Sequence, residues 1–396
     1  MFFQKKTREI YFDHAATTPT DPKVLEAMLP YFSESYGNPS ALYRKGREAN
    51  GALNDARRTV AQILHALPDN IIFTAGGTES DNLAIFGVGL GNIAKGKHIV
   101  TTQIEHHAVL NPIADLVKHG LGSTMVKVNH EGQVNAEDVI AAIRPDTTLV
   151  SVMYANNEIG TVEPIAEIGR AILQYRKQHN TVYPYFHTDA CQAAGYLDLD
   201  VEKLHVDLMT INGSKIYGPK GTGILYVRRG VTIQPIIFGG SQERRLRAGT
   251  ENLPAIVGFA RALELVQQDK IKATAREREL TTYLWKKLQA EIPGVRLNGP
   301  TIGVERLPNN LNVSFPGAEG EAILLYLDER GIMCSTGSAC TMDAPDPSHV
   351  LKAIGLTDTD AASSLRFSLG KINTRADVDY LMKHLPKILT QQKLSS

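Results

Sequence analysis

The most constraining feature of the sequence is an alternation, from about Ile71 to Val227, between short apolar runs and longer helical patterns. Each run is rich in Val, Ile, Leu or aromatic residues and is short enough to be a strand buried on both faces. Alternation of this kind predicts an α/β fold with a mainly parallel sheet. The expected strands are 98–102, 124–128, 148–154, 183–187, 207–211 and 223–227, with helices between them at 79–90, 135–143 and 164–178.

After Asn252 the pattern changes, which predicts a second, α+β module with fewer strands. The boundary is expected inside a helix near 255–270, without a flexible linker. Two separate long helices, a strand, a helix, a strand and a final helix are expected, at 254–268, 274–292, 310–315, 321–331, 364–369 and 374–391.

The composition excludes several classes of protein. With 42 Lys plus Arg against 42 Asp plus Glu, the chain shows no basic excess for binding nucleic acid. Three cysteines without a CxxC pair form neither a disulfide framework nor a structural zinc site, so no metal is expected. No apolar run is long enough to cross a membrane, and the N-terminus lacks the apolar stretch of a signal peptide. We therefore expect a cytoplasmic protein that does not contact membranes.

Two glycine-rich turns follow apolar runs. Residues 75–80, AGGTES, open a helix, where backbone N–H groups and the helix dipole favour a phosphate. The alternative is a plain strand–helix turn with Thr78 as N-cap. Residues 212–221, NGSKIYGPKG, contain Lys215 and Lys220. Desolvation lowers the pKa of a lysine in such a turn and makes it competent to form a Schiff base. Composition does not choose between the two lysines, and a solvated lysine is the alternative.

Further candidates follow other runs. Asp189 comes just after 183–187, at a strand end where ligands bind in open α/β sheets, and suits a protonated pyridine nitrogen. His106 and His107 follow another strand, and one of them suits stacking on a planar cofactor or proton transfer. Asp189 and both histidines are also compatible with an ordinary structural role. Cys340 lies in a small, polar segment, typical of an accessible nucleophile, whereas Cys191 and Cys334 are expected to be buried.

These segments occur together in a recognisable order. The chain resembles the cysteine desulfurases of the NifS/IscS type, within the class V aminotransferase family of pyridoxal-phosphate (PLP) enzymes, from about Ile10 to Leu381. The motifs that carry the resemblance are YFDHAATTP (11–19), YGNPSALY (36–43), FTAGGTESDN (73–82), EHHAVL (105–110), ANNEIG (155–160), HTDACQA (187–193), SKIYGPKG (214–221), RAGTEN (247–252), STGSACT (335–341) and LRFSLG (365–370).

The resemblance implies PLP-dependent transferase fold type I. It implies a large domain over 16–262 with a mainly parallel seven-stranded sheet, and a smaller α+β domain over 1–15 and 263–396. It also implies a homodimer, with Thr250 reaching the cofactor phosphate of the second subunit.

The family's functional residues have counterparts here. Lys215 would form the Schiff base with PLP, His106 would stack on its ring and move protons, and Cys340 would become a persulfide. The remaining implied cofactor contacts are Asp189 to the ring nitrogen, Gln192 to the phenolic oxygen, and Gly77, Thr78, Ser214 and Asn212 to the phosphate. Asn157, also expected at the cofactor, would bind the substrate carboxylate together with Arg366.

The implied reaction takes sulfur from L-cysteine onto Cys340 and releases L-alanine. The sulfur would pass to an acceptor such as an iron–sulfur scaffold protein, or towards tRNA thiolation. Residues 341–351 match in length the subgroup that supplies iron–sulfur assembly. A selenocysteine lyase, another class V enzyme such as an aminotransferase, and a non-catalytic sulfur-relay scaffold are the alternatives.

Two departures from the family pattern stand out. Ser214 precedes Lys215 where relatives commonly have His, and Asn212 stands where they often have Ser. A serine carries no charge, so the affinity for PLP and its pH dependence are expected to differ. The sequence ends soon after its last expected helix, whereas some relatives continue into a longer tail that helps to dock the scaffold protein. We expect that mode of docking to be absent or altered.

Overall fold

A seven-stranded sheet forms the larger part of the protein. The computed structural model describes residues 8–336 and 347–395. Within them the sheet has the order β2-β8-β7-β6-β5-β3-β4, in which β8 runs antiparallel to both neighbours and the other pairs are parallel. The α/β fold class with a mainly parallel sheet is thus confirmed. The strands are β2 Ile71–Thr74, β3 His98–Thr102, β4 Gly122–Val126, β5 Thr147–Ser151, β6 Tyr185–Asp189, β7 Leu208–Asn212 and β8 Gly223–Val227.

Successive strand residues enter two different cores. On β3, Ile99 belongs to a cluster with helices α4 and α5, whereas Val100 belongs to a cluster with α3, α7 and α9 (Leu253–Glu291). Because side chains alternate along a strand, both faces of this sheet are covered, which explains the continuous apolar runs. The flanking helices are α3 Arg44–Ile63, α4 Gly77–Gly91, α5 His107–Lys118, α6 Ala136–Ala141 and α7 Ile165–His179.

A second module is built on smaller sheets. One has the order β12-β10-β9, all antiparallel, and a two-stranded parallel sheet pairs β1 with β11. A separate apolar cluster includes Ile10, Leu284 and Leu385, so the N-terminal strand packs with the C-terminal part. The domain limits at 16 and 262 stay predictions. The elements are β1 Ile10–Tyr11, β9 Arg296–Leu297, β10 Asn310–Ser314, α10 Gly320–Asp328, β11 Ile332–Met333, β12 Ser364–Ser368 and α13 Arg375–Ser395.

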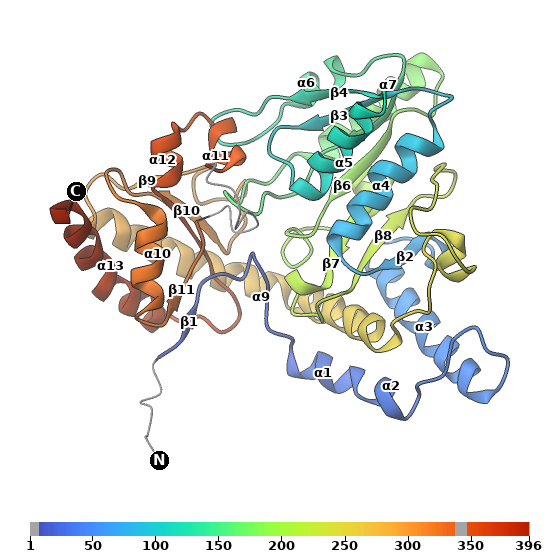
Figure 1. Ribbon diagram of the computed structural model, residues 1–396, viewed down its shortest axis with the longest axis horizontal. Helices are drawn as coiled ribbons and strands as arrows, with labels where there is room; N and C mark the ends of the chain where they lie inside the picture. The colour runs from blue at the N-terminus through green and yellow to red at the C-terminus, as the bar shows by residue number, and fades with distance from the viewer. Residues whose placement is uncertain (1–7, 337–346, 396) are drawn as a thin grey trace.

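One helix, α9 Leu253–Glu291, runs from the large sheet to the second module (Figure 1). The prediction of two helices, at 254–268 and 274–292, was wrong. Residues 269–273 contain neither Gly nor Pro, so nothing in the backbone ends the helix there. Ile271 is 85% exposed. The apolar periodicity lapses because this turn lies between two cores, not because the helix stops.

Short elements connect these parts. Among the described residues, α11 His349–Ala353 contributes Val350 and Leu351 to a small cluster with Ile104, Met153 and Ile159 of the large module. No helix in 8–336 or 347–395 has the length and apolar character needed to span a membrane. The other short elements are α1 Pro22–Met28, α2 Pro30–Ser33, α8 Val201–Leu204, α12 Asp358–Ala362 and the 3₁₀ turns η1 Pro68–Asn70, η2 Gly213–Lys215 and η3 Gln242–Arg245.

Candidate active site

A cavity of about 320 Å³ opens at the carboxyl ends of the central strands. This is the edge at which open α/β sheets bind their ligands. Strand ends supply Asp189 and Asn212, and the second module supplies Arg366. The residues lining the cavity are Ala15, Ala16, Gly77, Thr78, Asp81, His106, Met153, Asn157, Asp189, Cys191, Gln192, Asn212, Lys215 and Arg366.

The structure places the two candidate lysines differently. Lys215, in η2, lines this cavity, and its Nζ donates to the carbonyl of Ala16. Lys220 lines a neighbouring cavity, and its Nζ donates to the carbonyl of Thr18 at 2.6 Å. The N-terminal segment therefore separates them, and Lys215 is the lysine that shares a cavity with Asp189.

Asp189 lies among buried ionisable groups. Its Oδ1 accepts from the backbone N–H of Cys191 at 2.9 Å. Burial, and then the charge of Asp189, raise the pKa of Asp81 well above its usual value. Burial lowers the pKa of His187 to about 4. Both shifts favour the neutral forms of Asp81 and His187, which lie beside Asp189 at this end of the cavity.

His106 is held in one tautomer. As the N-cap of α5, its Nδ1 accepts from the N–H of Ala108 at 3.0 Å. Burial, and then nearby Lys215, lower the pKa of His106, although Asp189 opposes this. The neutral ring therefore carries its hydrogen on Nε2, the nitrogen free to meet a ligand.

The start of α4 forms a site for an anion. Its N-cap is Gly76, not Thr78, and no side chain in the described part of the protein caps the helix. A Cβ at Gly77 would lie 2.8 Å from Sγ of Cys191, so only glycine fits there. Free N–H groups at a helix start favour a phosphate. A neighbouring cavity of about 550 Å³, lined among others by Thr78, Asn212, Ser214 and Lys220, continues from this point.

The second module closes the other end of the main cavity with Arg366. Arg366, on β12, is buried; its Nη1 donates to the carbonyl of Asn157 at 3.0 Å, and its Nη2 lies 2.7 Å from Oδ1 of Asp13. Its Nε has no hydrogen-bond partner among the described residues. This buried guanidinium suits a carboxylate ligand.

The structure unites most of the predicted site residues. Gln192 lines the main cavity and donates to the carbonyl of Ala15 at 2.9 Å. Ser214 lies in the neighbouring cavity, where its Oγ donates to Oδ1 of Asn212 at 3.2 Å. Thr250 is exposed outside both cavities. Cys340 lies outside the described residues.

Sequence reasoning missed several residues at this site. Asp13 belongs to the first motif, YFDHAATTP, in which an acidic residue directly before His14 was the available signal of a functional position. Asp81 follows the glycine-rich turn within its helix. Cys191 and Cys334 are buried as expected, but Cys191 also lines the cavity. Met153 gave no chemical signal because its side chain contributes only shape, and Ala16 gave none because it acts through its backbone carbonyl, which accepts from Lys215.

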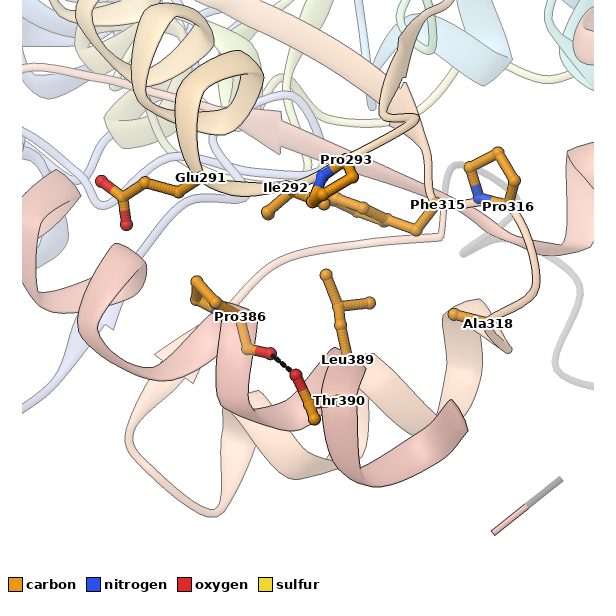
Figure 2. Close-up of a pocket in the computed structure, with 9 residues that line it drawn as sticks. All are labelled: Glu291, Ile292, Pro293, Phe315, Pro316, Ala318, Pro386, Leu389 and Thr390. Carbon is orange, nitrogen blue, oxygen red and sulfur yellow. Dashed lines mark hydrogen bonds between the residues drawn. The ribbon is translucent and has the colours of Figure 1, made fainter. Parts of the chain in front are cut away.

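Another cavity, of about 230 Å³, lies in the second module, away from these groups. Figure 2 shows Pro293 and Phe315 above it and Pro386 and Leu389 below. Glu291 is the ionisable residue among its lining side chains. Its apolar lining does not suit acid–base chemistry.

Comparisons with known proteins agree with this arrangement. The family described as Aminotransferase class-V matches residues 10–381. The chain is 49% identical, over 98% of its length and 96% of the relative's, to "Cysteine desulfurase IscS" of Clostridium botulinum. It is 44% identical to "Putative cysteine desulfurase IscS 1" of Bacillus subtilis, over 96% and 98%.

Solved structures show the same likeness. A "NifS-like protein" superposes with a TM-score of 0.89 at 38% identity, covering 97% of this chain and 100% of that one. "SspA in complex with cysteine" superposes with a TM-score of 0.79 at 37% identity, covering 92% and 100%.

Proposed function

Because the chain belongs to the class V aminotransferase family, we propose that it is a cysteine desulfurase, which converts L-cysteine to L-alanine and keeps the sulfur as a persulfide on Cys340. The observation that carries the proposal is that Lys215, Asp189 and Arg366 line one cavity of about 320 Å³. An amine, a carboxylate and a guanidinium in one cavity suit an amino acid bound beside a cofactor.

The residues present fit PLP. The uncapped start of α4 suits its phosphate, and the carboxylate of Asp189 suits its protonated ring nitrogen. When bound, PLP would supply an electron sink for the substrate's α-carbon. His106 would stack on the ring, Gln192 would contact the phenolic oxygen, Gly77, Thr78, Asn212 and Ser214 would hold the phosphate, Asn157 would contact cofactor and substrate, and Thr250 would come from a second subunit.

The chain's own groups divide the remaining work. Arg366 would bind the substrate carboxylate, and Lys215 would take and return protons near the α-carbon. His106 would donate from Nε2, because its Nδ1 is already engaged with Ala108. The carbon–sulfur bond of cysteine breaks and a sulfur–sulfur bond forms at Cys340. The carbon left behind gains a proton and becomes the methyl group of alanine.

A homodimer with sites at the subunit interface is part of the proposal. Large apolar side chains are exposed along α1, α2 and the loop that follows, including Leu29 at 57%, Phe32 at 61% and Leu42 at 90%. Such surfaces commonly mark protein interfaces. We further propose a cytoplasmic enzyme that delivers sulfur to an acceptor such as an iron–sulfur scaffold protein. Sedimentation showing an active monomer would rule out the dimer.

Mass spectrometry of Cys340 after incubation with PLP and L-cysteine tests the function. We expect the added mass of one sulfur on Cys340 and one alanine per sulfur transferred. Cys340→Ala should lose both, and Lys215→Ala should lose the visible absorbance of bound PLP. Full alanine formation by Cys340→Ala would favour another class V enzyme, and faster turnover of L-selenocysteine would favour a selenocysteine lyase.

Arg366→Lys tests the carboxylate site. Lysine keeps the charge but loses the planar fork, so we expect KM for L-cysteine to rise about tenfold or more, with a smaller change in kcat. Steady-state assays of alanine formation measure both constants. An unchanged KM would place the substrate carboxylate elsewhere.

A further inference from the structure

A strained turn lies beside the candidate phosphate site. Glu243, Arg244 and Arg245 have φ values of 41°, 57° and 65°, which places three consecutive non-glycine residues in the left-handed region. This conformation is unfavourable for an L-residue, because Cβ lies too close to the following carbonyl oxygen. Such turns persist only where surrounding contacts hold them.

A buried ion pair holds this turn. The guanidinium of Arg57, on α3, binds both carboxylate oxygens of Glu243, at 2.6 and 2.9 Å, and both side chains are buried. Oε2 of Glu243 also accepts from the N–H of Phe73 on β2 at 2.9 Å. Arg57 in addition donates to the carbonyl of Ile71. The turn is thereby attached to the strand that leads into the glycine-rich turn.

The segment after the turn reaches the phosphate site. Nε of Arg247 donates to Oε1 of Glu79 at 2.9 Å, while Oε2 of Glu79 accepts from the N–H of Ala75 at the same distance. Glu79 lies in the first turn of α4 and lines the cavity with Gly76 and Thr78. Its carboxylate would repel a phosphate, and Arg247 offsets that charge.

We propose that Arg57 and Glu243 are positioning residues for the cofactor: they hold the left-handed turn in the shape that places Arg247 on Glu79 beside the phosphate. This inference rests on the proposed function, because the phosphate concerned is that of PLP. Neither Arg57 nor Glu243 lines the two cavities, so both act through Arg247.

The test is the dissociation constant for PLP, measured by equilibrium dialysis on the full-length protein after removal of its cofactor. Glu243→Gln keeps the shape of the side chain and an acceptor for Phe73, but it removes the charge that binds Arg57. We expect affinity for PLP to fall about tenfold or more, as displacement of positioning groups does elsewhere.

A control pair lies in the same sheet, at the end where the parallel strands begin. Asp207 pairs with Arg176, both side chains are nearly buried, and Oδ2 of Asp207 accepts from the N–H of Phe186 at 2.8 Å. Like Glu243, Asp207 thus joins an arginine to a strand N–H, but Arg176 contacts only one of its oxygens, and Nε of Arg228 lies 3.4 Å from the other. This pair lies where β6 and β7 begin. Asp207→Asn should lower the denaturation midpoint as Glu243→Gln does, while leaving affinity for PLP within about twofold.

Arg247→Gln gives a second route if Glu243→Gln does not fold, because Arg247 is partly exposed. It should weaken PLP binding to a similar degree without a large loss of stability. Since both substitutions act on one path, the double variant should bind no more weakly than the worse single variant. The inference would be overturned if the losses of PLP affinity multiplied in the double variant, or if Arg247→Gln bound PLP with wild-type affinity. A wild-type protein that takes up no PLP would instead refute the proposed function.

Discussion

At the scale of single residues, several glutamates are buried, and two of them, Glu105 and Glu158, directly adjoin the cavity residues His106 and Asn157 in the chain. Burial raises the pKa of Glu105 to about 8, of Glu158 to about 7 and of Glu163 to about 8. Oε1 of Glu105 accepts from the N–H of Met153 at 2.8 Å, which ties the loop before His106 to the end of β5. A protonated carboxyl serves this purpose without a buried charge.

The raised pKa of Glu105 predicts a pH-dependent stability. The folded state holds the proton more tightly than the unfolded chain, so this contribution is complete below the ordinary pKa of 4.5 and is lost as the pH rises through about 8. Glu105→Gln has no such proton. Its free energy of unfolding relative to wild type should therefore rise by about 1.4 kcal/mol per pH unit between these limits.

Urea unfolding of both proteins at several pH values from 5 to 9 measures this difference. The difference should level off above about pH 8, where the carboxyl of Glu105 is ionised in both states. A difference that stays constant over the whole range would contradict the assigned pKa. The offset caused by the new amide does not depend on pH, so it does not affect the slope.

At the scale of elements, α11 is too short to be stable alone. Its N-cap Ser348 accepts from the N–H of Leu351 at 3.2 Å and donates to Oε2 of the buried Glu158. Nε2 of His349 meets the carbonyl of Glu105 at 2.9 Å. These contacts fasten the chain that follows residues 337–346 to the wall of the cavity.

Ser348→Ala should therefore lower the free energy of unfolding by more than the loss of an N-cap alone. Removing an N-cap costs about 1 kcal/mol, and leaving a buried acceptor without its donor costs about 1–3 kcal/mol more. Thr357 is the matched control, because it caps the equally short α12 through its contact with the N–H of Asp360 but is exposed. Urea unfolding of Ser348→Ala and Thr357→Ala measures both losses, and equal losses would refute the role of Glu158.

At the scale of the whole molecule, α9 joins two apolar cores. Leu263 lies in the core of the large sheet and Leu284 in that of the second module, and both are fully buried. Each leucine truncated to alanine should cost about 2–5 kcal/mol. If the predicted domains are separate folding units, the two substitutions will act on different transitions.

Trp285, the single tryptophan, packs against the core of the second module, so its fluorescence reports on the unfolding of that core. In Leu284→Ala, we expect the fluorescence transition to move to lower denaturant than the far-UV circular dichroism transition. In Leu263→Ala, fluorescence should not precede circular dichroism. Coincident transitions in both variants would show that α9 makes the two cores one cooperative unit.

The sequence by itself determined the fold class and most of the elements. Apolar runs separated by helical patterns predicted the α/β class, and the run at 223–227 coincides with β8 Gly223–Val227. These signals are local, because burial on both faces of a strand shows in consecutive residues. The family motifs likewise pointed to Lys215, Asp189 and Arg366, which the structure places in one cavity; their roles stay predictions.

Only the tertiary structure decided how these residues meet. The carbonyls of Ala16 and Thr18 separate Lys215 from Lys220 across 199 and 202 positions of sequence. Pairing of β12 with β10 brings Arg366 to the carbonyl of Asn157, 209 positions away. The same is true of α9, whose continuity depends on which cores it crosses. Contacts between distant segments follow from packing, and no local periodicity encodes them.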